Sequence, residues 1–281
     1  MHKYLFLIAV CLCAGNFLWA QKETNMVSKN VCVLDTSFYI PQLNRQRRVW
    51  IYLPPSYCTA KRKYPVLYMN DGQNIFSTAT SFAGEWGVDE ALDSLGTQVQ
   101  ESIVVAIDNG GEKRMNEYAP FDFKTASGQS IKGEGKEYVA FLITTLKPFV
   151  DKHYRTKKTA SHTFIGGSSM GALISFYAVL KHPDKFSGAA IFSPSFWAAP
   201  QLKDEIIKLG KKVKGKFYFY AGKQENDNMV PDMLSIFDLM NRHSKARITT
   251  VIRDGKHNEA AWKKEFPLFY EWLMASAKQG K

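Results

Sequence analysis

Apolar residues occur along this chain in two patterns, short continuous runs and longer stretches with spacings of three and four. The short runs are rich in β-branched and aromatic residues and predict eight strands, at residues 31–40, 47–53, 65–69, 102–107, 162–165, 188–192, 216–221 and 247–252. The longer stretches predict helices, as at 231–244, where Met233, Phe237 and Met240 recur on one face. Because the two patterns alternate after the first two strands, we expect an α/β fold with a mostly parallel sheet and helices on both faces.

The spacing of the predicted elements also indicates how the chain is organised. The first two strands are separated only by residues 41–44 and are expected to pair antiparallel. No linker, repeat or low-complexity tract interrupts residues 21–281, which have the size of one α/β domain. The longest irregular stretch, residues 108–135, is expected to be a loop over the functional site.

One strand leads directly into a candidate nucleophile. Residues 162–165 are followed by Gly-Gly-Ser-Ser-Met-Gly at 166–171, which contains the pattern Gly-x-Ser-x-Gly centred on Ser169, and then by a helix-forming segment. A serine used in catalysis must stand clear of the fold on a tight turn between strand and helix. Gly167 and Gly171, which have no Cβ, allow that turn and the close packing of the helix.

The order of acidic residues and histidines supports this interpretation. An α/β-hydrolase places an acid after a later strand and a histidine after the last strand. Glu225 follows the aromatic strand 216–221, and Asp227 is the competing acid two residues further on. His257 is the histidine that follows the final strand, 247–252. Ser169, His257 and Glu225 are therefore predicted to be nucleophile, base and acid.

The charge that develops during acyl transfer requires preorganised hydrogen-bond donors. One candidate is the main-chain N–H of Met170, the residue after the nucleophile. The second should come from the loop after the strand 65–69, where the main-chain N–H of Gln73 is the candidate.

Four segments, in the order found here, resemble the putative-esterase (esterase D-like) branch of the α/β-hydrolases: 64–76 (YPVLYMNDGQNIF), 114–120 (RMNEYAP), 166–171 (GGSSMG) and 257–262 (HNEAAW). That branch includes feruloyl and acetylxylan esterases of carbohydrate esterase family 1, S-formylglutathione hydrolases, trilactone siderophore esterases and mycolyltransferases. The resemblance extends from about residue 31 to residue 273. It implies the α/β-hydrolase fold.

The resemblance also implies roles for individual residues. It assigns the nucleophile to Ser169, the base to His257, the acid to Glu225, and the oxyanion amides to Met170 and the turn 71–73. Many relatives have aspartate as the acid, so that Asp227 remains an alternative to Glu225.

Other residues are candidates for substrate contact. Asp71 lies in the turn after the third predicted strand, and Asn109 and Arg114 lie in the long loop 108–135. Arg114 has a second interpretation, in which it pairs with Glu117 and only holds the loop. Trp197 follows the sixth strand and could stack on a sugar or phenolic ring, with core packing as the alternative.

The N-terminus predicts export. Residues 1–3 form a short positive start with Lys3, residues 4–18 are apolar but too few to span a membrane comfortably, and Ala20 precedes a polar segment. We therefore expect a cleavable signal peptide at 1–20 and a secreted or periplasmic protein without stable membrane insertion, with a retained membrane anchor as the alternative. Two cysteines, Cys32 and Cys58, then remain, and either a disulfide or two buried free thiols fits the sequence.

Composition argues against several functions. The formal net charge is +11, from 37 Lys and Arg against 26 Asp and Glu, but the basic residues are not interleaved with aromatic ones as in a nucleic-acid groove. No HExxH, metal-spaced His/Cys/Asp cluster, GxGxxG pattern or phosphate-loop lysine is present, so neither a metal nor a cofactor is expected.

The sequence therefore favours a secreted serine esterase that acts on small-molecule or oligosaccharide esters. Feruloyl or acetyl esters of carbohydrate are the favoured substrates. A trilactone siderophore esterase and an acyltransferase are close alternatives. A serine peptidase is disfavoured, because no gating domain is present. A non-catalytic binding module on a hydrolase fold is the alternative from another class.

Overall fold

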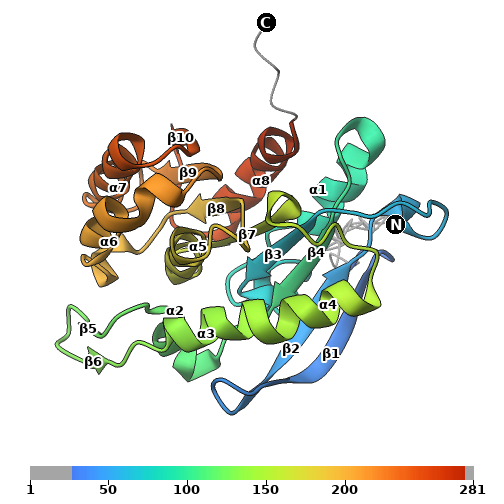
Figure 1. Cartoon of the computed structure of the whole chain (residues 1–281), viewed down its shortest axis with the longest axis horizontal. Coiled ribbons are helices and arrows are strands. Elements are labelled where there is room, and N and C mark those ends of the chain that lie inside the picture. The colour runs from blue at the N-terminus through green and yellow to red at the C-terminus, as the bar shows by residue number, and fades with distance from the viewer. Residues whose placement is uncertain (1–26, 276–281) are drawn as a thin grey trace, which may run out of the picture.

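The structure, a computed structural model, describes residues 27–275. Its main sheet contains eight strands in the order β1-β2-β4-β3-β7-β8-β9-β10 (Figure 1). Their bounds are β1 Val31–Ile40, β2 Arg45–Tyr52, β3 Val66–Asn70, β4 Ile103–Ile107, β7 Thr163–Ser168, β8 Gly188–Phe192, β9 Lys216–Gly222 and β10 Arg247–Arg253.

The eight predicted strands and their directions are confirmed. β1 and β2 form an antiparallel hairpin, and β2 also runs antiparallel to β4. The pairs β3–β4, β3–β7, β7–β8, β8–β9 and β9–β10 are all parallel. Since parallel strands end at the same edge, the loops after β3, β7, β8, β9 and β10 gather there.

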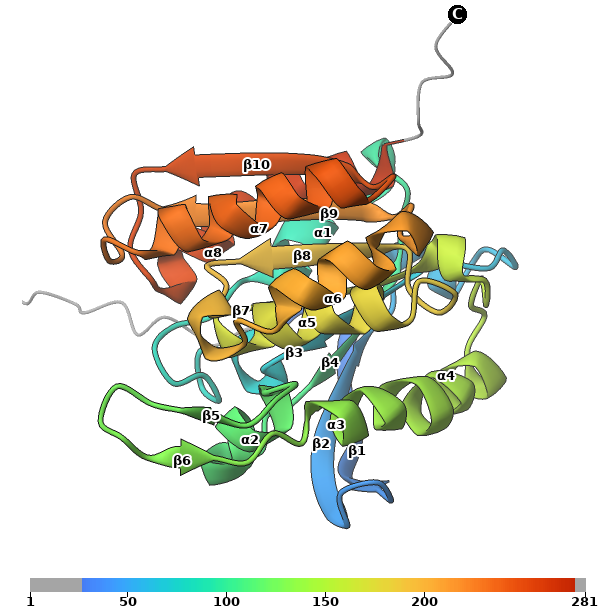
Figure 2. The ribbon, with the colours of Figure 1, turned by 60° about the vertical axis from the view of Figure 1, so that its left-hand side comes forward.

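Helices cover both faces of the sheet (Figures 1 and 2). One face packs against α3, α4, α5, α6 and α7, and the other against α1 and α8. The bounds are α1 Val88–Leu95, α2 Arg114–Tyr118, α3 Gly135–Phe141, α4 Lys147–His153, α5 Met170–Lys181, α6 Leu202–Leu209, α7 Met229–His243 and α8 Glu259–Met274. A π-helical turn, η5 Leu142–Leu146, joins α3 to α4, and shorter 3₁₀ turns include η2 Gly72–Asn74 and η7 Phe196–Ala198.

The alternation of side chains along β3 explains how one short strand serves both cores. Val66 and Tyr68 pack with the α5 side, whereas Leu67 and Met69 pack with the α8 side. All four are buried. A strand covered on both faces is apolar throughout instead of alternating, which is why it could be recognised as a continuous run.

The stretch 108–135 differs from the irregular loop that we predicted. It contains α2 and a small hairpin of β5 Phe123–Lys124 and β6 Ser130–Ile131, which projects from the main body (Figure 2). Strands of two residues are too short to give a recognisable alternation.

The two cysteines are free and exposed, so neither the disulfide nor the buried pair is formed. Cys32 lies on the edge strand β1, where alternate side chains face outward. Residues 1–20, the predicted signal peptide, lie outside the described residues. Within 27–275, no helix has the length and apolar character to cross a membrane.

Candidate active site

Ser169 lies on a strained turn between β7 and α5. Its backbone has φ 56° and ψ −121°, a region that non-glycine residues seldom occupy. A Cβ on Gly171 would lie 2.9 Å from Asp71 Oδ2, and one on Gly167 would lie 3.0 Å from the Gly171 carbonyl carbon. The turn therefore leaves little room for a side chain at either glycine, while Ser168 is buried at the end of the strand.

His257 and Glu225 meet at the same edge of the sheet. His257 Nδ1 lies 2.6 Å from Glu225 Oε2, and the Glu225 side chain is fully buried. Glu225 follows β9, and His257 follows β10, the next strand in the sheet. Asp227, by contrast, is exposed, and it makes no side-chain hydrogen bond within residues 27–275.

Ser193 and Trp262, which the sequence did not single out, hold Glu225 in place: Ser193 contacts it, and Trp262 contacts Ser193. Ser193 Oγ lies 2.7 Å from Glu225 Oε1, which also accepts a hydrogen bond from the Gly222 N–H at 2.6 Å. Trp262 Nε1 donates to Ser193 Oγ at 2.9 Å. The position of Ser193 directly after β8, next to the strand that carries Ser169, was a usable signal.

Ser169 and His257 line one cleft, with a cavity volume of about 890 Å³. Its polar lining includes Arg48, Asp71, Gln73, Asn74, Asp108, Asn109, Arg114 and Glu259. Ser169 Oγ lies 3.1 Å from Ser195 Oγ, and within the described chain it makes no hydrogen bond to His257. Hydrogen bonds of this kind are often long without substrate and tighten when it binds.

The structure brings Asp71, Asn109 and Arg114 together beside Ser169. Arg114 donates to both oxygens of Asp71, at 2.6 and 2.9 Å, and Asn109 Nδ2 donates to Oδ1 at 2.7 Å. Asp71 has φ 57° and begins the turn η2 that contains Gln73. This cluster therefore fixes the shape of the turn.

The prediction that Arg114 pairs with Glu117 is wrong. Glu117 is fully buried and pairs with Arg45 and Arg47, at 2.8 and 2.5 Å, whereas Arg114 pairs with Asp71. Arg114 and Glu117 are three residues apart in α2, which made them the expected partners in the sequence. In the structure, Glu117 pairs with arginines of β2, and Arg114 pairs with the aspartate after β3. Burial works to lower the pKa of Arg114, and the Asp71 carboxylate more than offsets this, so that the pKa is raised.

Two main-chain donors beside Ser169 are free. Within residues 27–275, the N–H groups of Met170 and Gln73 make no hydrogen bond. Both acceptors of Gln73 are engaged, since its Oε1 accepts from the Asn109 N–H at 3.1 Å and its carbonyl accepts from Thr80 Oγ1 at 2.8 Å. Free N–H groups at the edge of a cleft are suited to a developing negative charge.

The charged residues of the cleft largely neutralise one another. Arg48 Nε donates to Asp108 at 2.7 Å, and Arg114 is paired with Asp71. Burial raises the pKa of Asp108, and burial also raises that of Glu259, whose Oε1 accepts from Asn74 Nδ2 at 3.2 Å. Among the lining residues that the structure describes, no lysine or arginine is left unpaired.

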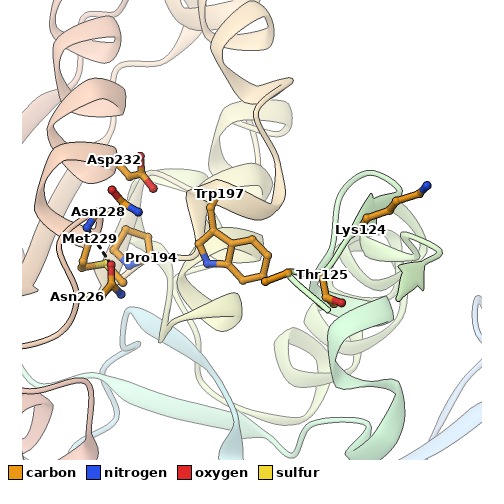
Figure 3. Close-up of a pocket in the computed structure, with 9 residues that line it drawn as sticks. Lys124, Thr125, Pro194, Trp197, Asn226, Asn228, Met229 and Asp232 are labelled. Carbon is orange, nitrogen blue, oxygen red and sulfur yellow. Dashed lines mark hydrogen bonds between the residues drawn. The ribbon is translucent and has the colours of Figure 1, made fainter. Parts of the chain in front are cut away.

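Trp197 lies elsewhere than we expected for a residue of this cleft. Its side chain is half exposed, not packed in the core, and it lines a separate pocket beside the β5–β6 hairpin (Figure 3).

Residues 27–275 contain no group of three or more His, Cys, Asp or Glu side chains arranged to hold a metal ion.

The strand order, the turn at Ser169 and the contact of His257 with Glu225 define a hydrolase of the α/β-hydrolase class. The profile of the family described as Putative esterase matches residues 40–269. The chain belongs to this family and is a carboxylic ester hydrolase, as the resemblance implied.

Two bacterial proteins are similar to this chain in sequence. The chain is 29% identical over 181 residues to the uncharacterized protein YbbA of Bacillus subtilis, covering 64% of this chain and 69% of YbbA. It is 25% identical over 202 residues to an endo-1,4-beta-xylanase/feruloyl esterase of Xylanibacter ruminicola, covering 70% of this chain and 25% of that protein.

Solved structures share the fold at lower identity. The BES protein from Bacillus cereus superimposes with a TM-score of 0.71 at 16% identity, covering 91% of this chain and 98% of that one. The enterobactin esterase FES from Shigella flexneri superimposes with a TM-score of 0.65 at 18% identity, covering 89% of this chain and 60% of that one.

Proposed function

We propose that this esterase uses Ser169 as nucleophile, His257 as general base and Glu225 as the acid that orients the histidine. The observation that carries the proposal is the 2.6 Å contact of His257 Nδ1 with the buried Glu225, in the cleft that also contains Ser169. With Nδ1 engaged, Nε2 is the ring nitrogen left to act on the serine. The conformation of Ser169 supports the same role, since a strained turn exposes its hydroxyl.

The reaction then proceeds through an acyl-enzyme. Ser169 Oγ attacks the ester carbonyl carbon while His257 Nε2 takes the serine proton, and the tetrahedral intermediate expels the alcohol, which receives that proton. Water then attacks the acyl-serine, its proton passing to His257. Ser169 regains the proton as the free acid leaves.

The main-chain N–H groups of Met170 and Gln73 are proposed to bind the oxyanion. Support comes from their lack of other partners and from the Asp71–Arg114 pair that fixes the Gln73 turn. Donors held in place before the reaction need no reorganisation when charge develops.

The substrate that we propose is an acyl ester of a neutral carbohydrate, with feruloyl and acetyl esters first. Both arginines of the cleft are paired with acids, so that the site favours hydroxyl groups over an anionic ligand. A feruloyl esterase activity is named for the Xylanibacter ruminicola relative. Phe82, whose side chain is almost fully exposed at the cleft, provides an aromatic surface for a phenolic acyl group.

A trilactone siderophore is the second candidate substrate, supported by the shared fold of the enterobactin esterase. The two are distinguished by kcat/KM for feruloylated and acetylated xylo-oligosaccharides, an aryl acetate and a trilactone siderophore. The proposal predicts the highest value for a carbohydrate ester. A higher value for the siderophore, or no turnover of any carbohydrate ester, would contradict it.

We also propose that the protein is exported and cleaved after Ala20. The support is the basic start and the apolar segment 4–18 in the sequence. N-terminal sequencing of the protein recovered from the producing cell tests this, and a mature chain that retains Met1 would contradict it.

A further inference from the structure

A second pocket lies beside the candidate active site and has no role in the chemistry proposed above. It has a cavity volume of about 370 Å³, within the range of small-molecule sites. Its lining comes from the tip of the β5–β6 hairpin, from the segment after β8 and from the start of α7 (Figure 3). The lining residues are Lys124, Thr125, Ala126, Pro194, Trp197, Asn226, Asn228, Met229 and Asp232.

Trp197 forms the aromatic part of this pocket. The side chain is 50% exposed, and its ring meets that of Phe123 edge to face, with centroids 5.6 Å apart and an interplanar angle of 77°. Figure 3 shows the indole between Thr125 on one side and Pro194 with the start of α7 on the other. The contact with Phe123 supports the ring and leaves part of its surface open to the pocket.

Polar groups around the indole are free to bind a ligand. Within residues 27–275, neither Trp197 Nε1 nor the Asp232 carboxylate makes a hydrogen bond or ion pair. The Lys124 side chain points away from the indole in Figure 3. The Asn226 amide oxygen accepts from the Asn228 N–H at 3.0 Å, and this leaves the Asn226 nitrogen free. In the Ser169 cleft, by contrast, both arginines are already paired.

The chemistry of these groups selects the ligand. An open aromatic surface packs against the C–H face of a sugar ring, while carboxylate and amide groups bind hydroxyls. Asp232 is the one acidic residue of the lining, and its carboxylate can accept hydrogen bonds from the hydroxyl groups of a neutral sugar but repels an anionic ligand.

The pocket is connected to the reacting serine through two short segments. Pro194 stands between Ser193, which contacts Glu225, and Ser195, whose hydroxyl lies 3.1 Å from that of Ser169. Asn226 directly follows Glu225. A ligand in this pocket is therefore adjacent to the site of acyl transfer.

We propose that this pocket is a second saccharide subsite, which binds a neutral sugar unit of the substrate other than the one that carries the ester. The inference rests on the proposed function, because it takes the alcohol part of the substrate to be an oligosaccharide. Trp197 stacks on the sugar ring, and Asp232 with Asn226 binds its hydroxyl groups. Short aryl esters, which cannot reach the pocket, do not use it.

Two variants test the proposal against matched controls. Trp197→Ala is compared with Tyr39→Ala, because Tyr39 is similarly exposed, at 52%, on the distant strand β1. Asp232→Asn is compared with Asp238→Asn, a change at an exposed position on the same helix. For acetylated xylotetraose, kcat/KM is expected to fall about tenfold in the two test variants, mainly through KM. For p-nitrophenyl acetate it should stay within about twofold of wild type in all four variants.

Binding of unesterified xylotetraose, followed by isothermal titration calorimetry, is an independent measurement. Wild type and both controls should bind it, and Trp197→Ala should bind it about tenfold more weakly. Equal losses on the two esters, unchanged kcat/KM on the oligosaccharide ester, or xylotetraose binding that is absent or insensitive to Trp197 would overturn the proposal. Failure of the proposed function is a different result, namely no Ser169-dependent hydrolysis of any ester, and the binding measurement still decides on the pocket in that case.

Discussion

Trp262 Nε1 donates a hydrogen bond to Ser193 Oγ at 2.9 Å, and this contact sets the direction of the next one. An indole N–H can only donate, so that Ser193 accepts there and directs its own hydrogen to Glu225 Oε1, 2.7 Å away. Trp262 also packs edge to face on His257, with ring centroids 5.2 Å apart. One tryptophan thus positions both the base and, through Ser193, the acid.

Replacing Ser193 by alanine should lower kcat about tenfold and leave KM within about twofold, because the lost contact orients Glu225 and does not touch substrate. Trp262→Phe should act on the same contact. The variant with both substitutions, Ser193→Ala and Trp262→Phe, should then have a kcat no lower than that of the more impaired single variant. Steady-state kinetics on an aryl acetate measures this, with Ser102→Ala as a control, since Ser102 is equally buried but bonds Tyr270. Unchanged kcat in Ser193→Ala would refute the positioning role.

Glu225→Ala should reduce kcat on the order of 10⁴-fold, because a triad without its acid loses the orientation of the histidine. Asp227→Ala should remain within about twofold of wild type, since Asp227 is exposed and does not contact His257. The two variants are matched in chemistry and differ by two positions in the chain. A larger loss in Asp227→Ala would overturn the assignment of the acid.

Arg114→Ala should destabilise the protein by about 3 kcal/mol, because it leaves the buried Asp71 carboxylate without its bidentate partner. It should also lower kcat, since Asp71 begins the turn that presents the Gln73 amide. Urea unfolding and steady-state kinetics measure the two effects. The exposed Arg242→Ala is the control, and a variant at Arg114 as stable as that control would contradict the argument.

Asp89 makes stability depend on pH. It is fully buried on α1, one of its oxygens has no hydrogen-bond partner, and burial raises its pKa to about 7. Since the folded protein keeps a proton that the unfolded chain releases near pH 4, stability falls as the pH rises from about 4 to about 7. We expect a free energy of unfolding on the order of 2 kcal/mol lower at pH 8 than at pH 5 from this group.

Asp89→Asn carries no titrating group at this position and should therefore lose less stability between pH 5 and pH 8 than wild type does. Urea unfolding at the two pH values measures the difference. Asp238→Asn, at an exposed position, should retain the wild-type slope. Equal slopes for wild type and Asp89→Asn would show that Asp89 does not carry the effect.

The sequence predicts all eight strands of the main sheet, both the central ones buried on both faces and the partly exposed edge strands β1 and β10. Continuous apolar runs such as the one that became β8 were found at their true bounds, and the order of the motifs around Ser169 and His257 followed from strand order. The β5–β6 hairpin could not be found in this way, because two-residue strands leave no periodic signal.

The details of the site depend on contacts between distant segments, which spacing does not encode. Nothing in the sequence shows that Arg114 pairs with Asp71, 43 residues away. The position of Ser193 directly after β8 indicates the edge of the sheet at which it lies, but not that its hydroxyl contacts Glu225. The choice between Glu225 and Asp227 likewise depends on the shape of one loop. Side-chain partners are decided by the folded geometry after the strands are in place.

Whether Ser169 is the nucleophile is decided by kcat for p-nitrophenyl acetate in Ser169→Ala, with Ser168→Ala as the matched control. Ser168 is the buried last residue of β7 and makes no side-chain hydrogen bond in the part of the chain that the structure describes. We expect a loss on the order of 10⁶ in kcat for Ser169→Ala and of less than about tenfold for Ser168→Ala. A Ser169→Ala protein that retains activity within about tenfold of wild type would contradict the assignment of Ser169 as the nucleophile.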